Sequence, residues 1–258
     1  HALLLKTAFP AACALTGGAE SASILRLANH SAVEVMVKRF AAAAALYGLL
    51  AAPAGAAVVS TDALREWNLI VLGDLTSSSE VEGRTFVGGN LSGSSSNYQA
   101  SGATPASPTG QPGLTVVGNV TGGHKNLNNG SGAVVGGNVT SGFNLNGPPQ
   151  TVKVGGTIAN TNVNQNTVRS GLAQSDAYFL SNLNQQKALL VSSLTDLSDS
   201  LSQLAANSTL TIAHNRATLV AAPGTAGMAV FNLTAADLNR FGEIALNVNG
   251  ADTVVINV

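Results

Sequence analysis

A short word recurs through the middle of the chain: one or two apolar residues followed by Gly-Gly-Asn or a close variant. Its copies occupy residues 86–90, 116–119, 134–138 and 153–157. The last glycines of the copies are residues 89, 118, 137 and 156, so the spacings are 29, 19 and 19 residues. The equal spacings indicate a periodic architecture, with a loop insertion of about ten residues in the Ser- and Gly-rich stretch 93–113. Residues 72–74 resemble an earlier, shorter copy.

A period near 19 residues is too short for a helical hairpin repeat and suits one coil of a right-handed parallel β-helix. Inward Val and Ile would then stack on their counterparts about 4.8 Å along the axis. Asn at each corner tolerates a left-handed backbone and can pair with the Asn of the next coil. An antiparallel sandwich with Gly-rich turns is the alternative, although hairpins require no fixed spacing. The repeat therefore predicts a mainly β protein built as a β-solenoid.

One long segment departs from this pattern. Residues 175–206 contain no Gly or Pro, and Leu183, Leu190, Leu197 and Leu204 recur every seven residues. Such a stripe predicts a long amphipathic helix. About 32 residues would span about 48 Å, roughly ten rungs of a β-helix, so we expect the helix to pack lengthwise along its flank. A coiled coil with another chain is the alternative use of the stripe.

The β pattern returns after this helix. Strands are predicted at 209–212, 217–221, 228–232, 243–248 and 253–258, with a short helical crossover within 232–241. The chain stops inside a strand pattern, and we therefore expect a C-terminally truncated domain whose cap or anchor lies beyond residue 258.

The N-terminal third carries a targeting pattern. Residues 36–39 supply a basic n-region, residues 40–50 a short run of mostly Ala and Leu, and residues 54–56 a small-residue cleavage site. This order predicts a signal peptide at 36–57, with a buried Ala-rich helix as the alternative. Residues 1–35 are then an upstream, non-native segment, and the domain itself spans 58–258.

Composition narrows the function classes. Only 10% of the residues are charged and 4% are aromatic. The part after residue 57 has eight Lys and Arg against eleven acidic residues, with no basic cluster, which argues against a nucleic-acid partner. The single cysteine, Cys13, precedes the signal peptide, so no disulfide is expected in the exported part.

Several words resemble the bacterial choice-of-anchor A family, namely residues 68–75, 81–84, 87–90, 135–138 and 247–250. The resemblance implies a secreted or surface-attached β-helical adhesive domain with a variable C-terminal anchor such as LPXTG or PEP-CTERM. The family has no agreed catalytic residues, and this chain shows no anchor signal. A solenoid with a long flanking helix is also similar to the ice-binding adhesin fold, which by itself says little about function.

Candidate chemistry is sparse. The two histidines after residue 57, His124 and His214, lack any zinc-binding spacing, and no Gly-x-Ser-x-Gly elbow occurs. The densest charged group contains Asp74, Glu80 and Glu82 with Arg84. It could be a structural device in which a partly buried Glu82 pairs with Arg84 or hydrogen-bonds to the backbone, a calcium site, or a glycosidase acid and base. We assign no catalytic, cofactor-binding or metal-binding residue.

These observations predict a non-enzymatic adhesion module that is secreted or at the cell surface. Its expected partners are a matrix protein, a polysaccharide or a cell surface, and nothing outside the signal peptide is expected to enter a membrane. Loop 93–113, with Asn97 and Tyr98, is the expected specificity element. The alternatives are an ice-binding protein and a carbohydrate-active enzyme, although only Trp67, Tyr98 and Tyr178, besides Phe, could stack on sugars after the signal region.

Overall fold

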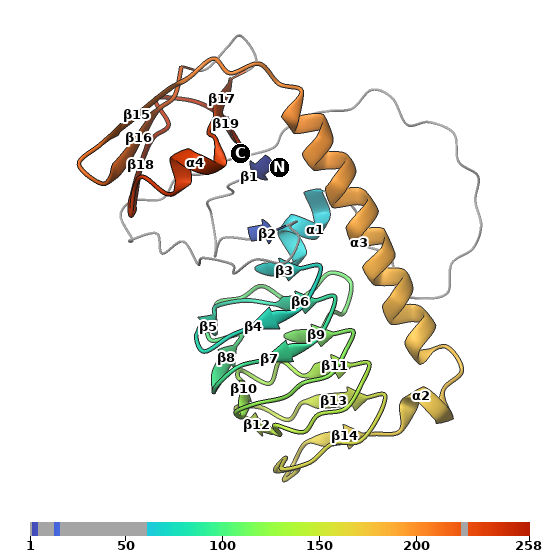
Figure 1. The fold of residues 1–258 in the computed structure, drawn as a ribbon. Helices are drawn as coiled ribbons and strands as arrows, with labels where there is room; N and C mark the ends of the chain where they lie inside the picture. Colours follow the sequence, from blue (N-terminus) through green and yellow to red (C-terminus); the bar gives the residue numbers. More distant parts are fainter. Residues whose placement is uncertain (1, 5–12, 16–60, 223–226) are drawn as a thin grey trace, which may run out of the picture. The chain divides into compact units, whose positions relative to one another are not determined.

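The computed structural model describes residues 2–4, 13–15, 61–222 and 227–258. Within them the protein is mainly β, with parallel sheets and one long helix (Figure 1). The chain divides into two compact units, which we call the ladder unit (described residues 13–15 and 61–194) and the C-terminal unit (described residues 2–4, 195–222 and 227–258). The signal peptide predicted at 36–57 lies outside the described residues.

The ladder unit contains the short helix α1 (Thr61–Glu66) and three open parallel sheets. The seven-stranded sheet has the order β14-β13-β11-β9-β6-β3-β2, with β2 (Cys13–Leu15), β3 (Leu69–Val71), β6 (Thr85–Val87), β9 (Leu114–Val116), β11 (Ala133–Val135), β13 (Thr151–Val154) and β14 (Thr167–Arg169). The four-stranded sheet contains β5 (Glu80–Val81), β8 (Ser96–Tyr98), β10 (Lys125–Leu127) and β12 (Phe143–Leu145). The third pairs β4 (Leu75–Thr76) with β7 (Leu91–Ser92), and single bridges continue it through Val120, Val139 and Ile158.

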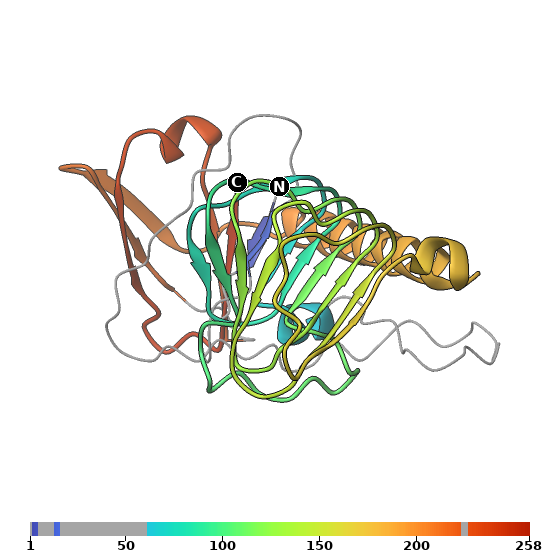
Figure 2. The same cartoon turned by 90° about the horizontal axis from the view of Figure 1, so that it is seen from below.

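From β3 onward the chain visits the three sheets in a fixed order, one circuit after another (Figure 2). The glycines that end each sequence word lie in register. Gly118 donates its N–H to the carbonyl of Gly89, Gly137 to Gly118, and Gly156 to Gly137, each at 2.9 Å. The 29- and 19-residue spacings read from the sequence are therefore confirmed as the register of successive circuits.

Glycine at these corners is a steric requirement. A Cβ built on Gly136 would lie 2.1 Å from the carbonyl oxygen of Val117, and one on Gly155 would lie 1.9 Å from that of Gly136. Any side chain there would force neighbouring circuits apart. Between the corners, alternate residues point inward and form one continuous core of Leu, Val and aromatic side chains.

The last circuit of the ladder unit keeps the pairing of β14 with β13 and adds side-chain acceptors for other backbone donors. Phe143 donates its N–H to Thr161 Oγ1 (3.0 Å), and Gln150 donates its N–H to Asn166 Oδ1 (3.0 Å). Side chains thus satisfy backbone donors at this edge, which leaves less of it free to pair with another strand.

The long helix is shorter than predicted. Residues 172–175 form a separate turn, α2 (Leu172–Ser175), and the main helix α3 covers Phe179–Ser202 rather than 175–206. Asp176 interrupts the two, since its Oδ1 accepts the N–H of Tyr178 at 3.0 Å. At the other end, Ser200 and Ser202 donate to the carbonyls of Asp196 and Asp199, which favours termination.

The first part of α3 packs on the glycine corners of the ladder unit. A Cβ built on Gly155 would lie 3.2 Å from Phe179 Cε1, and one on Gly136 would lie 3.4 Å from Leu183 Cδ1. Leu183 and Leu190 of the predicted stripe are buried, whereas Leu197 is half-buried. No helix of the described residues is long and apolar enough to cross a membrane.

The C-terminal unit contains two three-stranded sheets. One has the order β15-β16-β18, with β15 (Thr209–Ala213), β16 (Arg216–Val220) and β18 (Glu243–Asn247). The other has the order β1-β19-β17, with β1 (Ala2–Leu4), β19 (Thr253–Asn257) and β17 (Met228–Asn232). The helix α4 (Ala235–Leu238) connects β17 to β18.

The five strands and the crossover predicted after the long helix are confirmed with small shifts at their ends. Thr234 caps α4, accepting the N–H of Asp237, whose carboxylate in turn accepts the N–H of Thr234. β1 and β2 lie within residues 1–35, where β1 pairs with β19 and β2 with β3. The assignment of that segment as non-native stays a prediction.

Candidate functional site

One face of the ladder unit presents two columns of polar side chains in register, which we call the polar array. The first column consists of Asp74, Asn90, Asn119, Asn138 and Thr157, all exposed. The second consists of Thr76, Ser92, Thr121 and Thr140. Between the columns, inward side chains such as Val120 and Val139 belong to the core. Successive circuits repeat the array about every 4.8 Å.

The first column is held by its own hydrogen bonds. Asp74 Oδ1 accepts the N–H of Asn90 (2.6 Å), Asn90 Oδ1 accepts that of Asn119 (2.9 Å), and Asn119 Oδ1 accepts that of Asn138 (2.8 Å). Asn138 Oδ1 accepts the N–H of Thr157 at 2.8 Å. The pairing of corner Asn residues predicted from the sequence is confirmed. Because each side chain is fixed by the next circuit, the array presents its polar groups in a preorganised order.

A separate column of Asn side chains, outside the polar array, crosses the four-stranded sheet. Asn126 donates from Nδ2 to Asn97 Oδ1 at 2.8 Å, and Asn144 donates to Asn126 Oδ1 at 2.7 Å. All three side chains are half-buried. Asn97, expected to be a specificity residue of a loop, is therefore part of a regular ladder.

Tyr98, the other expected specificity residue, is buried. Its ring belongs to the ladder core, and Ser96 donates its Oγ–H to the Tyr98 Oη at 3.2 Å. Burial raises the pKa of Tyr98. The prediction that Tyr98 recognises a ligand is wrong, because the side chains of a three-residue strand alternate and this one points inward. The insertion itself begins after β8, near Gln99.

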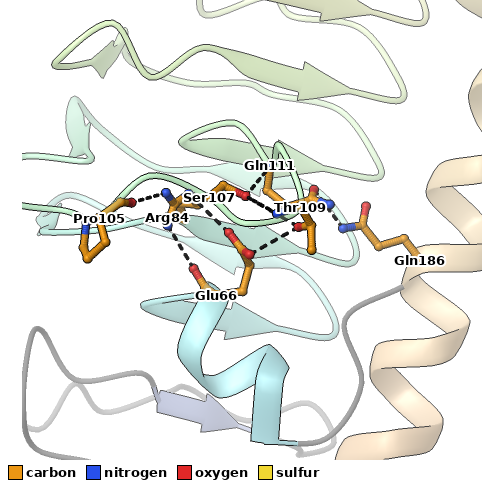
Figure 3. Close-up of polar contacts among 7 residues, drawn as sticks. All are labelled: Glu66, Arg84, Pro105, Ser107, Thr109, Gln111 and Gln186. Carbon is orange, nitrogen blue, oxygen red and sulfur yellow. Dashed lines mark hydrogen bonds and ion pairs between the residues drawn. The ribbon is translucent and has the colours of Figure 1, made fainter. Parts of the chain in front are cut away.

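A buried ion pair fastens that insertion to the ladder unit (Figure 3). Arg84 Nε lies 3.4 Å from Glu66 Oε1, and both side chains are almost completely buried. Arg84 also donates to the carbonyl of Pro105, while Glu66 Oε2 accepts from Thr109 Oγ1 at 3.2 Å. Burial lowers the pKa of the Arg84 guanidinium, and the neighbouring Glu66 carboxylate raises it. The pair thus fixes the base of the loop.

Two further contacts extend this cluster. Ser107 Oγ accepts the N–H of Gln111 at 2.7 Å, and Gln111 Oε1 accepts from Gln186 Nε2 of α3 at 3.0 Å (Figure 3). The insertion is therefore tied to Glu66 of α1, to Arg84 just before β6, and to the long helix.

The acidic group read from the sequence does not come together as predicted. Arg84 pairs with Glu66 rather than Glu82, and the side chains of Glu80 and Glu82 are exposed. Asp74 is engaged by Asn90 in the first column of the array. Within the part of the chain that the structure describes, no three His, Cys, Asp or Glu side chains form a metal-binding group.

The remaining candidate residues occupy separate places. His124 and His214 are both exposed, one in each unit. Lys125, which sequence reasoning did not single out, is fully buried, and its Nζ donates to the carbonyls of Gly93 (3.2 Å) and Ser94 (2.6 Å). Its alternation with Leu127 could have indicated the inward direction.

Comparison with known proteins gives one match. The family model described as "Putative Ice-binding-like adhesive domain" matches residues 60–258, which covers all of the chain after α1 begins. Neither the curated proteins nor the solved structures contain a match to the chain.

Proposed function

Since the chain belongs to the family described as "Putative Ice-binding-like adhesive domain", we propose that it is a non-enzymatic adhesion module, secreted or displayed on the surface of a bacterium. It attaches to an extended partner, such as a polysaccharide, a matrix protein or a cell surface, through the polar array.

The observation that carries this proposal is the order of the array. Four consecutive hydrogen-bonded steps, from Asp74 to Thr157, fix the first column, and the hydroxyls of the second column lie beside it. In that column Thr76 Oγ1 lies 3.0 Å from Ser92 Oγ. A rigid row of repeated weak sites gains from multivalent contact with a repetitive surface.

The finer identity of the fold and family is also part of the proposal. Three sheets visited in fixed order, with Gly corners in register, support a right-handed parallel β-helix for the ladder unit. Several of the words that resemble the choice-of-anchor A family contribute to the polar array. Asp74 of the Gly-Asp-Leu word and Asn90 of the Val-Gly-Gly-Asn word, for example, are adjacent members of the array.

Ice is a second candidate surface, favoured by the second column. Thr76, Thr121 and Thr140, with Ser92, place hydroxyl groups at one position of successive circuits although the sequence shows no sustained Thr-x-Thr pattern. A carbohydrate-active enzyme is less well supported. Trp67 and Tyr98, two of its potential sugar-stacking residues, are buried. Glu80 lies on the two-residue strand β5 and Glu82 just after it, and both are exposed.

The experiment is an attachment assay with array variants. Thr121→Lys with Thr140→Lys places long cationic side chains in the second column, and we expect attachment to collagen, cellulose, bacterial cells or ice to fall at least about tenfold. The matched control is Asn184→Lys with Gln185→Lys on the exposed side of α3, which makes the same change of charge.

Two outcomes contradict the proposal. If the folded array variant attaches as well as the parent protein, a surface other than the polar array must mediate adhesion. Glycan cleavage by the parent protein that is abolished by Glu82→Gln would identify an enzyme instead.

A further inference from the structure

Five of the eight Lys and Arg side chains that the structure describes have an ion-pair or carbonyl partner. Four arginines form ion pairs: Arg65 with Asp62, Arg84 with Glu66, Arg216 with Glu243 and Arg240 with Asp237. Lys125 is bonded to two carbonyls. Among the residues that the structure describes, Lys153, Arg169 and Lys187 have no such partner, and two of these three are neighbours.

Lys153 and Arg169 lie directly opposite each other on adjacent parallel strands. Residues 151–153 of β13 pair with residues 167–169 of β14, so Thr151 faces Thr167 and Lys153 faces Arg169. All four side chains are exposed, while Val152 between them is buried. Adjacent strands are about 4.8 Å apart, so the register holds two like charges together on the outer face of the sheet. Such a pair is destabilising unless an anion bridges it.

An exposed aromatic residue lies in the segment that continues from this sheet. Tyr178 is 73% exposed, more than any other large apolar side chain of the described residues. Tyr178 lies in the connection between α2 and α3. The helix α2 is held near the end of β13, because Ala173 donates its N–H to the carbonyl of Gly155 at 2.9 Å. Phe179, the next residue, is buried against the same corner.

We propose that Lys153, Arg169 and Tyr178 form a binding site for acidic polysaccharide. The two cations bind a carboxylate or sulfate group, the guanidinium of Arg169 by paired hydrogen bonds and the Lys153 ammonium as a point charge. The Tyr178 ring stacks on a sugar, and the hydroxyls of Thr151 and Thr167 can hydrogen-bond to sugar hydroxyls. This inference deepens the adhesion function proposed above and rests on it, but it uses a different face from the polar array.

The same cations would be expected if they only protected an open edge, because β14 is the last strand of its sheet and charged side chains discourage edge pairing. If the cations only protect the edge, Tyr178 plays no part in binding and a sugar polymer is not preferred over another polyanion. The test therefore measures both the effect of Tyr178 and the preference for sugar polymers.

The test uses the whole chain and three polymers in affinity electrophoresis: polygalacturonate for carboxylate, dextran sulfate for sulfate, and neutral dextran. Binding to at least one acidic polymer is expected, with loss at about 1 M salt, where the screening length is about 3 Å. Lys153→Ser with Arg169→Ser should raise the apparent Kd at least about tenfold. Lys187→Ser with Arg240→Ser removes the same charge and should leave the Kd within about twofold.

Tyr178→Ala should raise the Kd about fivefold while Leu180→Ala, at an exposed position two residues away, should not. Polyphosphate, which offers charge without sugar rings, should bind equally well to the parent and to Tyr178→Ala.

Equal loss of binding in the two double variants would overturn the site, as would acidic-polymer binding that is unaffected by Lys153→Ser with Arg169→Ser. If Lys153→Ser with Arg169→Ser still attaches to neutral surfaces through the array, the adhesion function holds even though this site has failed. Unchanged attachment of the folded array variant to every surface would instead be the failure of the proposed function.

Discussion

The ladder unit and the C-terminal unit both bring strands of successive circuits side by side, but they stabilise the circuit differently. In the ladder unit the strands have two to four residues, and Asn columns and Gly corners connect one circuit to the next. In the C-terminal unit β16 pairs with β18 and β17 with β19, both in parallel, through strands of five residues. Arg216 pairs with Glu243 and Met228 with Thr253, so its circuits have 27 and 25 residues. They are longer than the 19-residue circuits of the ladder unit and shorter than the 29-residue circuit that holds the insertion.

Side-chain ladders are correspondingly fewer in the C-terminal unit. One Asn pair joins β17 to β19, where Asn257 donates from Nδ2 to Asn232 Oδ1 at 3.3 Å. The two sheets there enclose a common apolar core that includes Leu219, Phe231 and Val254. Short strands thus depend on corners and ladders, whereas longer strands depend on backbone pairing and core burial.

The largest difference between the two units is expected in the free energy of unfolding that is lost when an ion pair is broken. Arg84→Ala leaves the Glu66 carboxylate buried without its partner, and we expect the free energy of unfolding to fall by about 3–5 kcal/mol. Arg216→Ala breaks a pair whose side chains are half or more exposed, and should cost less than about 1 kcal/mol. Urea denaturation followed by the fluorescence of Trp67, the single tryptophan, measures the ladder unit, and circular dichroism follows both units.

Similar losses for Arg84→Ala and Arg216→Ala would show that the Glu66–Arg84 pair is open to water, and so would not fasten the insertion. Glu66→Gln with Arg84→Met, which removes both charges, should recover part of the loss.

Corner glycines should respond next. Gly155→Ala puts a Cβ 1.9 Å from the carbonyl oxygen of Gly136 in the preceding circuit, and overpacking of this kind costs about 2–3 kcal/mol. Gly242→Ala in the C-terminal unit meets only the end of the Asn215 side chain at 3.0 Å and should cost less. Gly73→Ala is the matched control in the ladder unit, because nothing lies within 4 Å of its Cβ. Thermal unfolding compares the three, and an equal loss in Gly73→Ala would contradict the corner argument.

The Asn columns should have a smaller effect. Asn119→Ala removes the acceptor of the Asn138 N–H and the donor to Asn90 Oδ1, both at an exposed corner, so we expect a loss of about 1 kcal/mol. Asn247→Ala in the C-terminal unit removes only a local bond to the N–H of Asn249 and should cost about half as much or less. Chemical denaturation of both variants makes the comparison, and a loss in Asn247→Ala as large as in Asn119→Ala would remove the distinction between the units.

The same contrast explains what could be predicted from the sequence. The ladder register was predictable because Gly corners and stacked Asn residues recur at fixed spacing and leave a visible word. The circuits of the C-terminal unit leave no such word, since their connections differ in length, and only the individual strands could be predicted. The body of α3 was predictable from its Leu stripe. Its ends depend on Asp176 and on Ser bonding to nearby carbonyls, which periodicity does not report.

The buried contacts of the candidate site were harder to foresee. Glu66 is 18 residues from Arg84, while Glu82 is only two residues away, so sequence proximity favoured the wrong partner. Tyr98 was misplaced because a three-residue strand gives too little alternation to fix which face is buried. The polar array was visible only in its Asn column. The Thr column follows from the register, not from any repeated pair in the sequence.

The smallest expected effect concerns the buried Lys125. Burial lowers its pKa below that of the unfolded chain, so between the two values the unfolded chain binds more protons. The free energy of unfolding should therefore rise with pH between the folded pKa and the ordinary lysine pKa of about 10.4. In the other direction, this stability is lost as the pH falls through the folded pKa. The slope cannot exceed about 1.4 kcal/mol per pH unit. Lys125→Met should lack this rise.

The buried Tyr98 acts in the opposite direction, because its raised pKa causes stability to be lost as the pH rises above the ordinary tyrosine value of about 10. Subtracting the Lys125→Met curve from the parent curve removes this contribution, which both proteins share. Urea denaturation from about pH 8 to pH 10.5, followed by Trp67, gives the difference in the ladder unit. A flat difference would mean that Lys125 reaches water in the folded chain. The described residues of the C-terminal unit include no lysine, so the alkaline rise should be confined to the unit that buries Lys125.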